Sequence, residues 1–289
     1  MKPPPFDYLR ASNLEEVWDA LDRDEDVKLI AGGQSLVPLM NLRLASPSLL
    51  VDITRLKALQ GVTSQSSVLR IGALTRHAEI ERHPLVVDQA PLLSQAASWV
   101  AHAQIRNRGT LGGSVAHSDS AAELPAALLA LDATMVARSR GGERRIPARE
   151  FFGSYFTTAL VPGELLTAVE LPVALPSATW GFAEFARRRG DYAIGGAAVY
   201  ADRGPDQVCR VVRAGLLAAG PAPCLAPGLG ESMVGRVVDA GLISRTVEST
   251  LAQLSPGENV HGTVEYRRDI IGEMLRRALA SAFQLGEVA

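Results

Sequence analysis

AGGQSL at residues 31–36 and TLGGS at residues 110–114 each place two adjacent glycines before a polar side chain. The first segment follows a strand-like apolar run at 27–30 and precedes a helix-like run from Leu36. Glycine allows positive φ angles and lets the backbone come close to a ligand. Successive N–H groups in such a turn form a concave anion site. A tight strand-to-helix turn explains one such segment equally well, but two in one chain predict a diphosphate held from two sides.

Neither segment matches a common nucleotide-binding motif. Walker A ends in Gly-Lys-Ser/Thr, and the dinucleotide fingerprint needs GxGxxG, so ATP hydrolysis and an ordinary Rossmann NAD site are disfavoured. The stretch from 104 to 125 is dense in small, hydroxyl and charged residues, which a plain surface loop explains poorly. Thr110, Ser114 and Ser118 can donate to phosphate oxygens, and Glu123 can accept from ribose or ribityl hydroxyls.

His117 and Asp119 suggest an alternative to a nucleotide site, which is a hydrolase active site or a metal site. The sequence has no GxSxG elbow and no third ligand nearby, and its five histidines are scattered. We therefore predict no metal and no catalytic side chain. The two cysteines, Cys209 and Cys224, exclude a disulfide framework. They also cannot hold an iron–sulfur cluster alone, because a cluster normally takes four cysteines.

The composition indicates which binding partners and which cellular compartment to expect for this protein. The chain has 289 residues, 47% of them hydrophobic, which is enough for two domains with a large core. A formal net charge of −2 gives no signal for nucleic acid. No apolar run approaches the roughly 18 residues of a membrane span, and residues 1–5 lack a signal-peptide core. We expect a cytoplasmic protein.

Hydrophobic periodicity predicts two small lobes followed by a separate domain. In the first lobe, Ser12 and Glu15 form a capping box for a helix to residue 21, and strands at 27–31 and 49–53 make a βαβ-like unit. The second lobe is predicted from strands at 68–72 and 165–171, helices at 76–81, 92–100 and about 121–131, a polar turn at 104–108, and a hairpin at 133–137 and 143–147.

Pro172, Pro176 and Ser177 mark a linker to the last domain. Strands are predicted at 180–188, 197–202 and 207–216, then a loop at 220–230 and helices at 231–240, 244–254 and 264–283. Three antiparallel strands followed by helices indicate an α+β domain.

Three motifs, in this order and spacing, carry a family resemblance: AGGQSLVPLMNLRL at 31–44, QIRNRGTLGGSVAHSDSAAELPA at 104–126 and RRRGDYAI at 187–194. Together they resemble the FAD-binding medium subunit of molybdenum hydroxylases, and most closely that of aerobic carbon monoxide dehydrogenase. The resemblance spans nearly the whole chain. It implies the two-lobed FAD domain shared with vanillyl-alcohol oxidase and the cell-wall enolpyruvyl reductase at 1–175, with lobes at about 1–58 and 59–175. A C-terminal α+β domain follows at 176–289.

The resemblance also implies the residues of a cofactor site. The two glycine segments would hold the FAD diphosphate, Glu123 would contact the flavin side of the molecule, Leu166 would lie near an edge of its ring systems, and Tyr192 would lie against the isoalloxazine. The implied set is Ala31, Gly32, Gly33, Gln34, Ser35, Leu36, Thr110, Leu111, Gly112, Gly113, Ser114, His117, Ser118, Glu123, Leu166 and Tyr192.

The sequence departs from the family pattern at a few positions. Gln34 stands where some wider relatives have a histidine linked covalently to flavin, so we predict non-covalent FAD. Glu184 lies near a lysine of some relatives, which leaves that contact open. Ser114 and Ser120 replace a frequent asparagine and proline without loss of hydrogen-bonding or turn-forming ability.

The resemblance implies partners as well. A small subunit would carry two [2Fe–2S] clusters and a large subunit the molybdenum cofactor, in a dimer of heterotrimers. This chain would pass electrons from the clusters to an external acceptor. Two alternatives are a stand-alone FAD reductase that uses NADPH, and a flavin-free scaffold between subunits. The substrate, which would bind on another chain, and the acceptor (a quinone, NAD or dioxygen) stay open.

Overall fold

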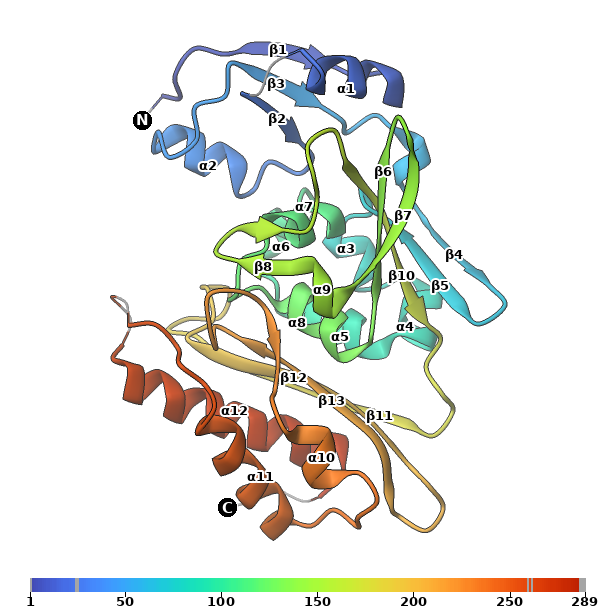
Figure 1. Cartoon of the computed structure of the whole chain (residues 1–289), viewed down its shortest axis with the longest axis vertical. Helices are drawn as coiled ribbons and strands as arrows, with labels where there is room; N and C mark the ends of the chain where they lie inside the picture. Colours follow the sequence, from blue (N-terminus) through green and yellow to red (C-terminus); the bar gives the residue numbers. More distant parts are fainter. Residues whose placement is uncertain (1, 24–25, 259, 261, 286–289) are drawn as a thin grey trace.

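The computed structural model describes residues 2–23, 26–258, 260 and 262–285. Three units, each built on its own sheet, are stacked along the long axis of the molecule (Figure 1). Separate parallel and antiparallel sheets with interspersed helices confirm the expected α+β class. Residue 1 and residues 286–289, at the outer ends of the two expected domains, lie outside the described residues.

The N-terminal unit is a parallel sheet with the strand order β1-β3-β2. The expected βαβ-like lobe is present, and β1 adds a strand that was not predicted. The core contains the fully buried side chains of Val17 and Val51. Its elements are β1 (Asp7–Arg10), α1 (Leu14–Leu21), β2 (Val27–Ile30), α2 (Leu36–Asn41), β3 (Leu49–Asp52) and the 3-10 helix η1 (Lys57–Leu59).

The capping box of α1 lies one residue later than predicted. Asn13, not Ser12, is the N-cap, and its side chain accepts a hydrogen bond from the N–H of Glu16 at 3.0 Å. The Glu16 carboxylate in turn accepts from the Ser12 N–H at 2.9 Å and the Ser12 hydroxyl at 2.6 Å. Glu16 rather than Glu15 therefore takes the acidic position of the box, and its carboxylate accepts from Ser12, the residue before the N-cap.

The central unit is an antiparallel sheet with the order β4-β5-β10-β6-β7. Its inner face, with Leu69, Ile71, Met135 and Val169 fully buried, packs on helices of the same unit. The elements are β4 (Val62–Gln65), β5 (Val68–Gly72), α3 (His77–Ile80), α4 (Pro84–Gln89), α5 (Pro91–Trp99), α6 (Ala103–Arg106), α7 (Leu111–His117), α8 (Glu123–Ala130), β6 (Thr134–Ser139), β7 (Gly142–Pro147), α9 (Ala148–Phe151), β8 (Phe152–Ser154), β9 (Thr157–Thr158) and β10 (Leu165–Pro172).

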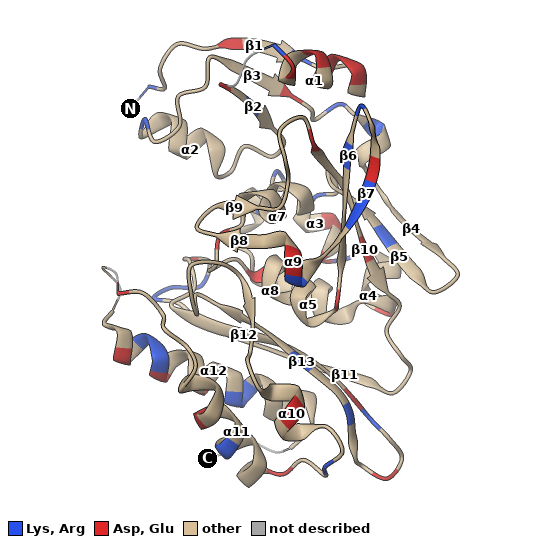
Figure 2. Cartoon of the chain, in the orientation of Figure 1, with Lys and Arg blue, Asp and Glu red and all other residues tan. Residues whose placement is uncertain are grey.

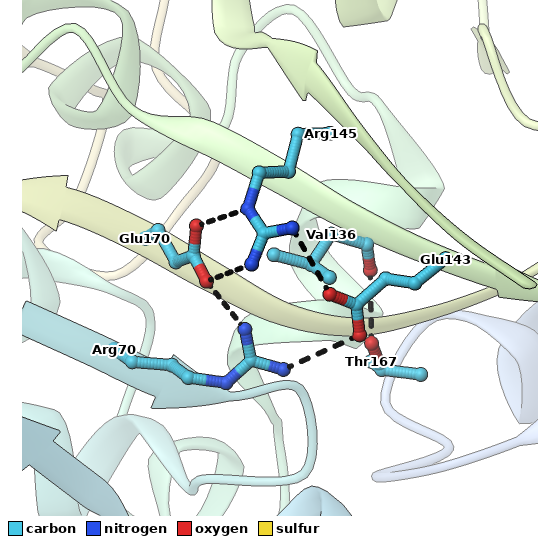
Figure 3. Close-up of polar contacts among 6 residues, drawn as sticks. All are labelled: Arg70, Val136, Glu143, Arg145, Thr167 and Glu170. Atoms are coloured by element: carbon cyan, nitrogen blue, oxygen red, sulfur yellow. Dashed lines mark hydrogen bonds and ion pairs between the residues drawn. The ribbon is translucent and has the colours of Figure 1, made fainter.

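An ion-pair network covers the outer face of this sheet (Figure 3). Glu170 of β10 accepts hydrogen bonds from Arg70 of β5 at 2.5 Å and from Arg145 of β7 at 2.9 and 3.1 Å. Glu143 joins both arginines at 3.9 and 3.3 Å. Because side chains alternate between the faces of a strand, the apolar neighbours of Arg70 point inward.

Replacing Glu170 with glutamine is expected to destabilise the protein by about 1 kcal/mol at pH 7. Burial acts to raise the pKa of Glu170, but the bonds from Arg145 and Arg70 outweigh it and hold the pKa below 4.5. The ionised form therefore stabilises the fold above pH 4.5, and this contribution disappears as the pH falls through the lowered value. Urea unfolding of both proteins at pH 7 and pH 3.5 measures it. A difference that is unchanged at pH 3.5 contradicts this origin.

The C-terminal unit is an antiparallel sheet with the order β11-β12-β13-β14 and three helices. The glycine at 181 in β11 gives close contact with α12, since a Cβ there would overlap the carbonyl of Ala278. Gly215 in β13 gives the same close contact with Ala126 of α8. The sheet is thus packed between its own helix and the central unit. Its elements are β11 (Ala178–Phe185), β12 (Gly195–Arg203), β13 (Cys209–Leu217), β14 (Cys224–Leu225), α10 (Leu229–Met233), α11 (Ala240–Leu251) and α12 (Val264–Ala282).

Several local predictions were wrong. The polar turn at 104–108 is mostly helix α6, and the second glycine segment forms the first turn of α7 rather than a loop. The helix predicted at 231–240 ends at Met233, and β14 adds a fourth strand to the last sheet. Strand β4 and helix α4 were not predicted. Across the described ranges, no helix combines the length and apolar character that crossing a membrane requires.

Candidate functional site

The two glycine segments meet where the N-terminal and central units join. Gly32 is buried against the backbone of the second segment, and a Cβ at Gly32 would overlap the carbonyl of Arg108 and lie 2.7 Å from the Cα of Gly109. Only glycine fits between these backbones. At the far side of the same junction, Arg140 of the β6–β7 turn donates to Glu15 and Asp19 of α1 at 2.6 and 2.7 Å.

The first segment presents a row of unpaired amides. Within the described residues, no group accepts a hydrogen bond from the backbone N–H of Gly32, Gly33, Gln34 or Ser35. Gly33 has a φ of +70°, and the Gln34 side chain donates back to the carbonyl of Gly32 at 2.9 Å, which fixes the turn. Neither 31–41 nor 110–117 contains Lys, Arg, Asp or Glu, as Figure 2 shows for α2 and α7. An anion bound here would therefore be held by backbone dipoles.

The second segment offers different groups. The amides of Leu111 and Gly112 donate to the carbonyls of Thr75 at 3.0 Å and Ala73 at 2.8 Å. Thr110 is the N-cap of α7, and its hydroxyl accepts from the amide of Gly113 at 3.1 Å. The first amides of α7 are thus already bonded within the chain. The groups of this segment that are left to contact a ligand are the hydroxyl of Ser114 and the exposed backbone of Gly113, which has no side chain.

A pocket of about 120 Å³ lies between the two segments. Four predicted residues line it: Ala31, Gly112, Gly113 and Leu166. The rest of the wall was not predicted and is mainly apolar: Leu29, Ile53, Ala73, Leu74, Ala116, Leu160, Glu164 and Leu165. These positions read as ordinary strand and core residues, so no sequence signal separates them from the interior. Glu164 is neutralised by Arg144, whose Nε and Nη2 donate to its carboxylate at 2.6 and 2.8 Å.

Tyr192 extends the site to the C-terminal unit. The residue is 66% exposed, and its phenol lies near Ser35 of the first segment. Partial burial, then the charges of Asp119 and Glu123, raise the pKa of Tyr192, while Ser35 acts to lower it. The loop that carries it is held by Arg189, which lies over the Trp99 ring at 5.7 Å. Parts of all three units therefore meet around this cleft.

Two carboxyl groups, Glu123 at the start of α8 and Glu184 near the end of β11, interact beside Tyr192. Burial, and then the charge of Asp119, raises the pKa of Glu123 to about 7. Burial and the charge of Glu123 raise the pKa of Glu184 to about 8. Oxygen Oε2 of Glu184 is buried and has no partner within the described residues. Ionisation of one group disfavours ionisation of the other, so the pair does not readily carry two negative charges near neutral pH.

Of the remaining predicted residues, Leu36 begins α2, and neither it nor His117 nor Ser118 lines the pocket. His117 stacks on Phe156 with the ring centroids 4.9 Å apart, and burial lowers the pKa of its imidazole. Ser118 is fully buried in a left-handed conformation, and its hydroxyl donates to the carbonyl of Thr157 at 3.3 Å. The Ser118 hydroxyl is therefore already used inside the chain. In the part of the chain that the structure describes, no group of three His, Cys, Asp or Glu side chains could hold a metal.

The junction of lobes, the row of free amides and the apolar pocket define a domain suited to a nucleotide diphosphate. Residues 4–174 match the family model described as the FAD binding domain in molybdopterin dehydrogenase. Residues 180–282 match the model of the CO dehydrogenase flavoprotein C-terminal domain. The chain therefore belongs to the family of FAD-binding subunits of molybdopterin dehydrogenases. It is an oxidoreductase subunit with an FAD-binding domain.

Individual relatives agree over the full length. The chain is 43% identical to the 6-hydroxypseudooxynicotine dehydrogenase complex subunit alpha of Paenarthrobacter nicotinovorans, over 98% of this chain and 96% of that protein. It is 36% identical to the nicotine 6-hydroxylase medium subunit of the same organism, over 98% and 99%. A solved chain of carbon monoxide dehydrogenase from Hydrogenophaga pseudoflava superposes with a TM-score of 0.96 at 32% identity, over 98% and 99%. The resemblance stated from the three sequence motifs is confirmed.

Proposed function

We propose that this chain is the electron-transfer subunit of a heteromeric molybdenum hydroxylase. It receives electrons from [2Fe–2S] clusters on a small subunit and delivers them to an external acceptor. The molybdenum cofactor belongs to a large subunit, in a dimer of heterotrimers. We also propose the domain division at residue 175 and a cytoplasmic location. The relatives are subunits of dehydrogenase complexes, which favours this function over an NADPH reductase that acts alone.

One observation carries the proposal: the unpaired amides of Gly32 to Ser35 and the bare surface of Gly113 border the same junction between lobes. This arrangement fits an FAD diphosphate. The amides would bind its oxygens, Ser114 and Thr110 would face them from α7, and the leucines of the pocket would exclude water. When bound, the flavin supplies the electron chemistry and the protein supplies binding and orientation. Gln34 lacks a nucleophilic ring nitrogen, which supports non-covalent binding.

Side chains outside the diphosphate site would contact the rest of the cofactor. Tyr192 would place its ring against the flavin. Glu123 would accept from ribityl hydroxyls. The raised pKa values of Glu123 and Glu184 keep this end of the site from carrying two full negative charges at pH 7. We assign no general acid or base for substrate chemistry to this chain.

The test uses the purified native complex. We expect substrate to reduce the iron–sulfur centres, seen by electron paramagnetic resonance, whether or not this chain carries flavin. Transfer to the external acceptor should require flavin on this chain. NADPH oxidation by the isolated flavin-loaded chain would instead support the reductase. Acceptor reduction by a flavin-free complex at the normal rate would overturn the proposed role.

A further inference from the structure

His77 contacts the start of the second glycine segment and is not among the residues that line the pocket. It begins α3 and is 6% exposed. Its backbone N–H donates to the carbonyl of Gly109 at 3.1 Å, and its ring nitrogen Nε2 lies 2.8 Å from the carbonyl oxygen of Thr110. A Cβ at Gly109 would come within 2.8 Å of the imidazole. The ring therefore lies against Gly109, just before the segment, and against the backbone of Thr110, its first residue.

The short stretch 73–77 fixes the second segment as a whole. Besides His77, the carbonyls of Ala73 and Thr75 accept from Gly112 and Leu111, and the Arg76 side chain donates to the carbonyl of Arg108. That same Arg108–Gly109 backbone is the surface on which Gly32 packs. Contacts from 73–77 thus set the distance between the two glycine segments. His77 is the member of this set that can change its charge.

The hydrogen bond to Thr110 requires a proton on Nε2, because a carbonyl only accepts. The neutral ring then has no proton on Nδ1, and Nδ1 is buried without a partner in the described part of the chain. A second proton would place an unpaired charge in the interior. The neighbouring groups do not offset this charge. Arg76 lies beside the ring, and Arg106 of α6 is paired with Glu81 at 2.9 Å. Helix α5, which packs against α3, has no ionisable side chain. Glu79, on α3 itself, is the remaining charged group of that helix.

We propose that neutral His77 is a positioning residue that holds the second glycine segment in register with the first, and that its protonation releases FAD. This inference rests on the proposed placement of the diphosphate. Burial, with smaller effects of Arg76 and Arg106, lowers the pKa of His77 to about 4 even though the Thr110 carbonyl acts to raise it. An imidazole freed from this position titrates near 6.5. Release is therefore coupled to proton uptake between about pH 6.5 and pH 4.

Three variants of the full chain test this. In His77→Gln the amide can donate to the Thr110 carbonyl but does not titrate. His77→Phe fills the space without a donor. His83→Gln removes a histidine at the start of α4, outside the residues that contact the glycine segments, and serves as control. The readout is the dissociation constant for FAD, measured by flavin fluorescence between pH 7.5 and pH 4.5, with thermal unfolding recorded in parallel.

The native chain and His83→Gln should lose at least about tenfold in FAD affinity across this range. His77→Gln should bind within about threefold of the native chain at pH 7.5 and should not show the acid loss. His77→Phe should bind at least about tenfold more weakly at pH 7.5. If His77→Gln loses as much FAD affinity at acid pH as the native chain does, the inference is overturned. This comparison holds even if His77→Phe fails to fold. If Gly113→Val still holds FAD, the diphosphate placement itself fails instead.

Discussion

Replacing Gly113 with valine is expected to give a folded protein that no longer holds FAD. Gly113 is exposed in the first turn of α7 and lines the pocket between the two glycine segments. A Cβ there meets only the Thr110 hydroxyl, at 2.8 Å, so the fold can adjust. The valine side chain would instead occupy the place of the diphosphate. We expect affinity to fall on the order of 100-fold, which corresponds to about 2.7 kcal/mol.

Flavin absorbance of the purified variant, and its FAD dissociation constant after reloading, measure this loss. Gly230→Val is the matched control, because Gly230 also lies in the first turn of a helix and its Cβ would meet nothing within 4 Å. The control should keep its flavin. In a complex with its partner subunits, the Gly113 variant should still allow substrate to reduce the iron–sulfur centres. Retained flavin in folded Gly113→Val counts against the site.

Replacing Glu184 with glutamine is expected to stabilise the protein at alkaline pH by up to about 5 kcal/mol, since each unit of raised pKa corresponds to about 1.4 kcal/mol. The pKa of Glu184 in the folded protein is about 8, above its ordinary 4.5, because the side chain is largely buried and lies beside Glu123. The folded protein therefore holds a proton that the unfolded chain releases. Stability of the native protein falls as the pH rises from about 4.5 to about 8, and glutamine removes this loss.

Urea unfolding at pH 5 and pH 9 compares the variant with the native protein. The two should be close in stability at pH 5 and differ at pH 9. Glu150→Gln is the control, since its carboxylate is 60% exposed beside Arg149. Equal effects of Glu184→Gln at both pH values would contradict the raised pKa of Glu184.

Elements with a strong local pattern were predicted well from the sequence. The apolar face of α1, the β2–α2–β3 unit and the long helix α12 lie within a few residues of their expected positions. Strand β1 was missed because its four residues are largely exposed and it is defined by pairing with β3, some forty residues away. Local propensity carries no such information.

The candidate site was likewise predicted from the sequence only in part. The two glycine segments and Tyr192 were identified by their motifs, yet the second segment was taken for a loop because glycine disfavours helix. Tertiary bonds to Ala73 and Thr75, with the Thr110 cap, make it helical. His77 escaped notice since a single histidine in a short helix has no sequence signature. The leucines of the pocket wall are likewise indistinguishable from core residues until the lobes are assembled.

A crystal structure of the FAD-loaded chain would show where the diphosphate binds. We expect its oxygens within hydrogen-bond distance of the amides between Gly32 and Ser35, with Gly113 in van der Waals contact on the other side. A diphosphate bound elsewhere, with those amides facing only solvent, would contradict this expectation.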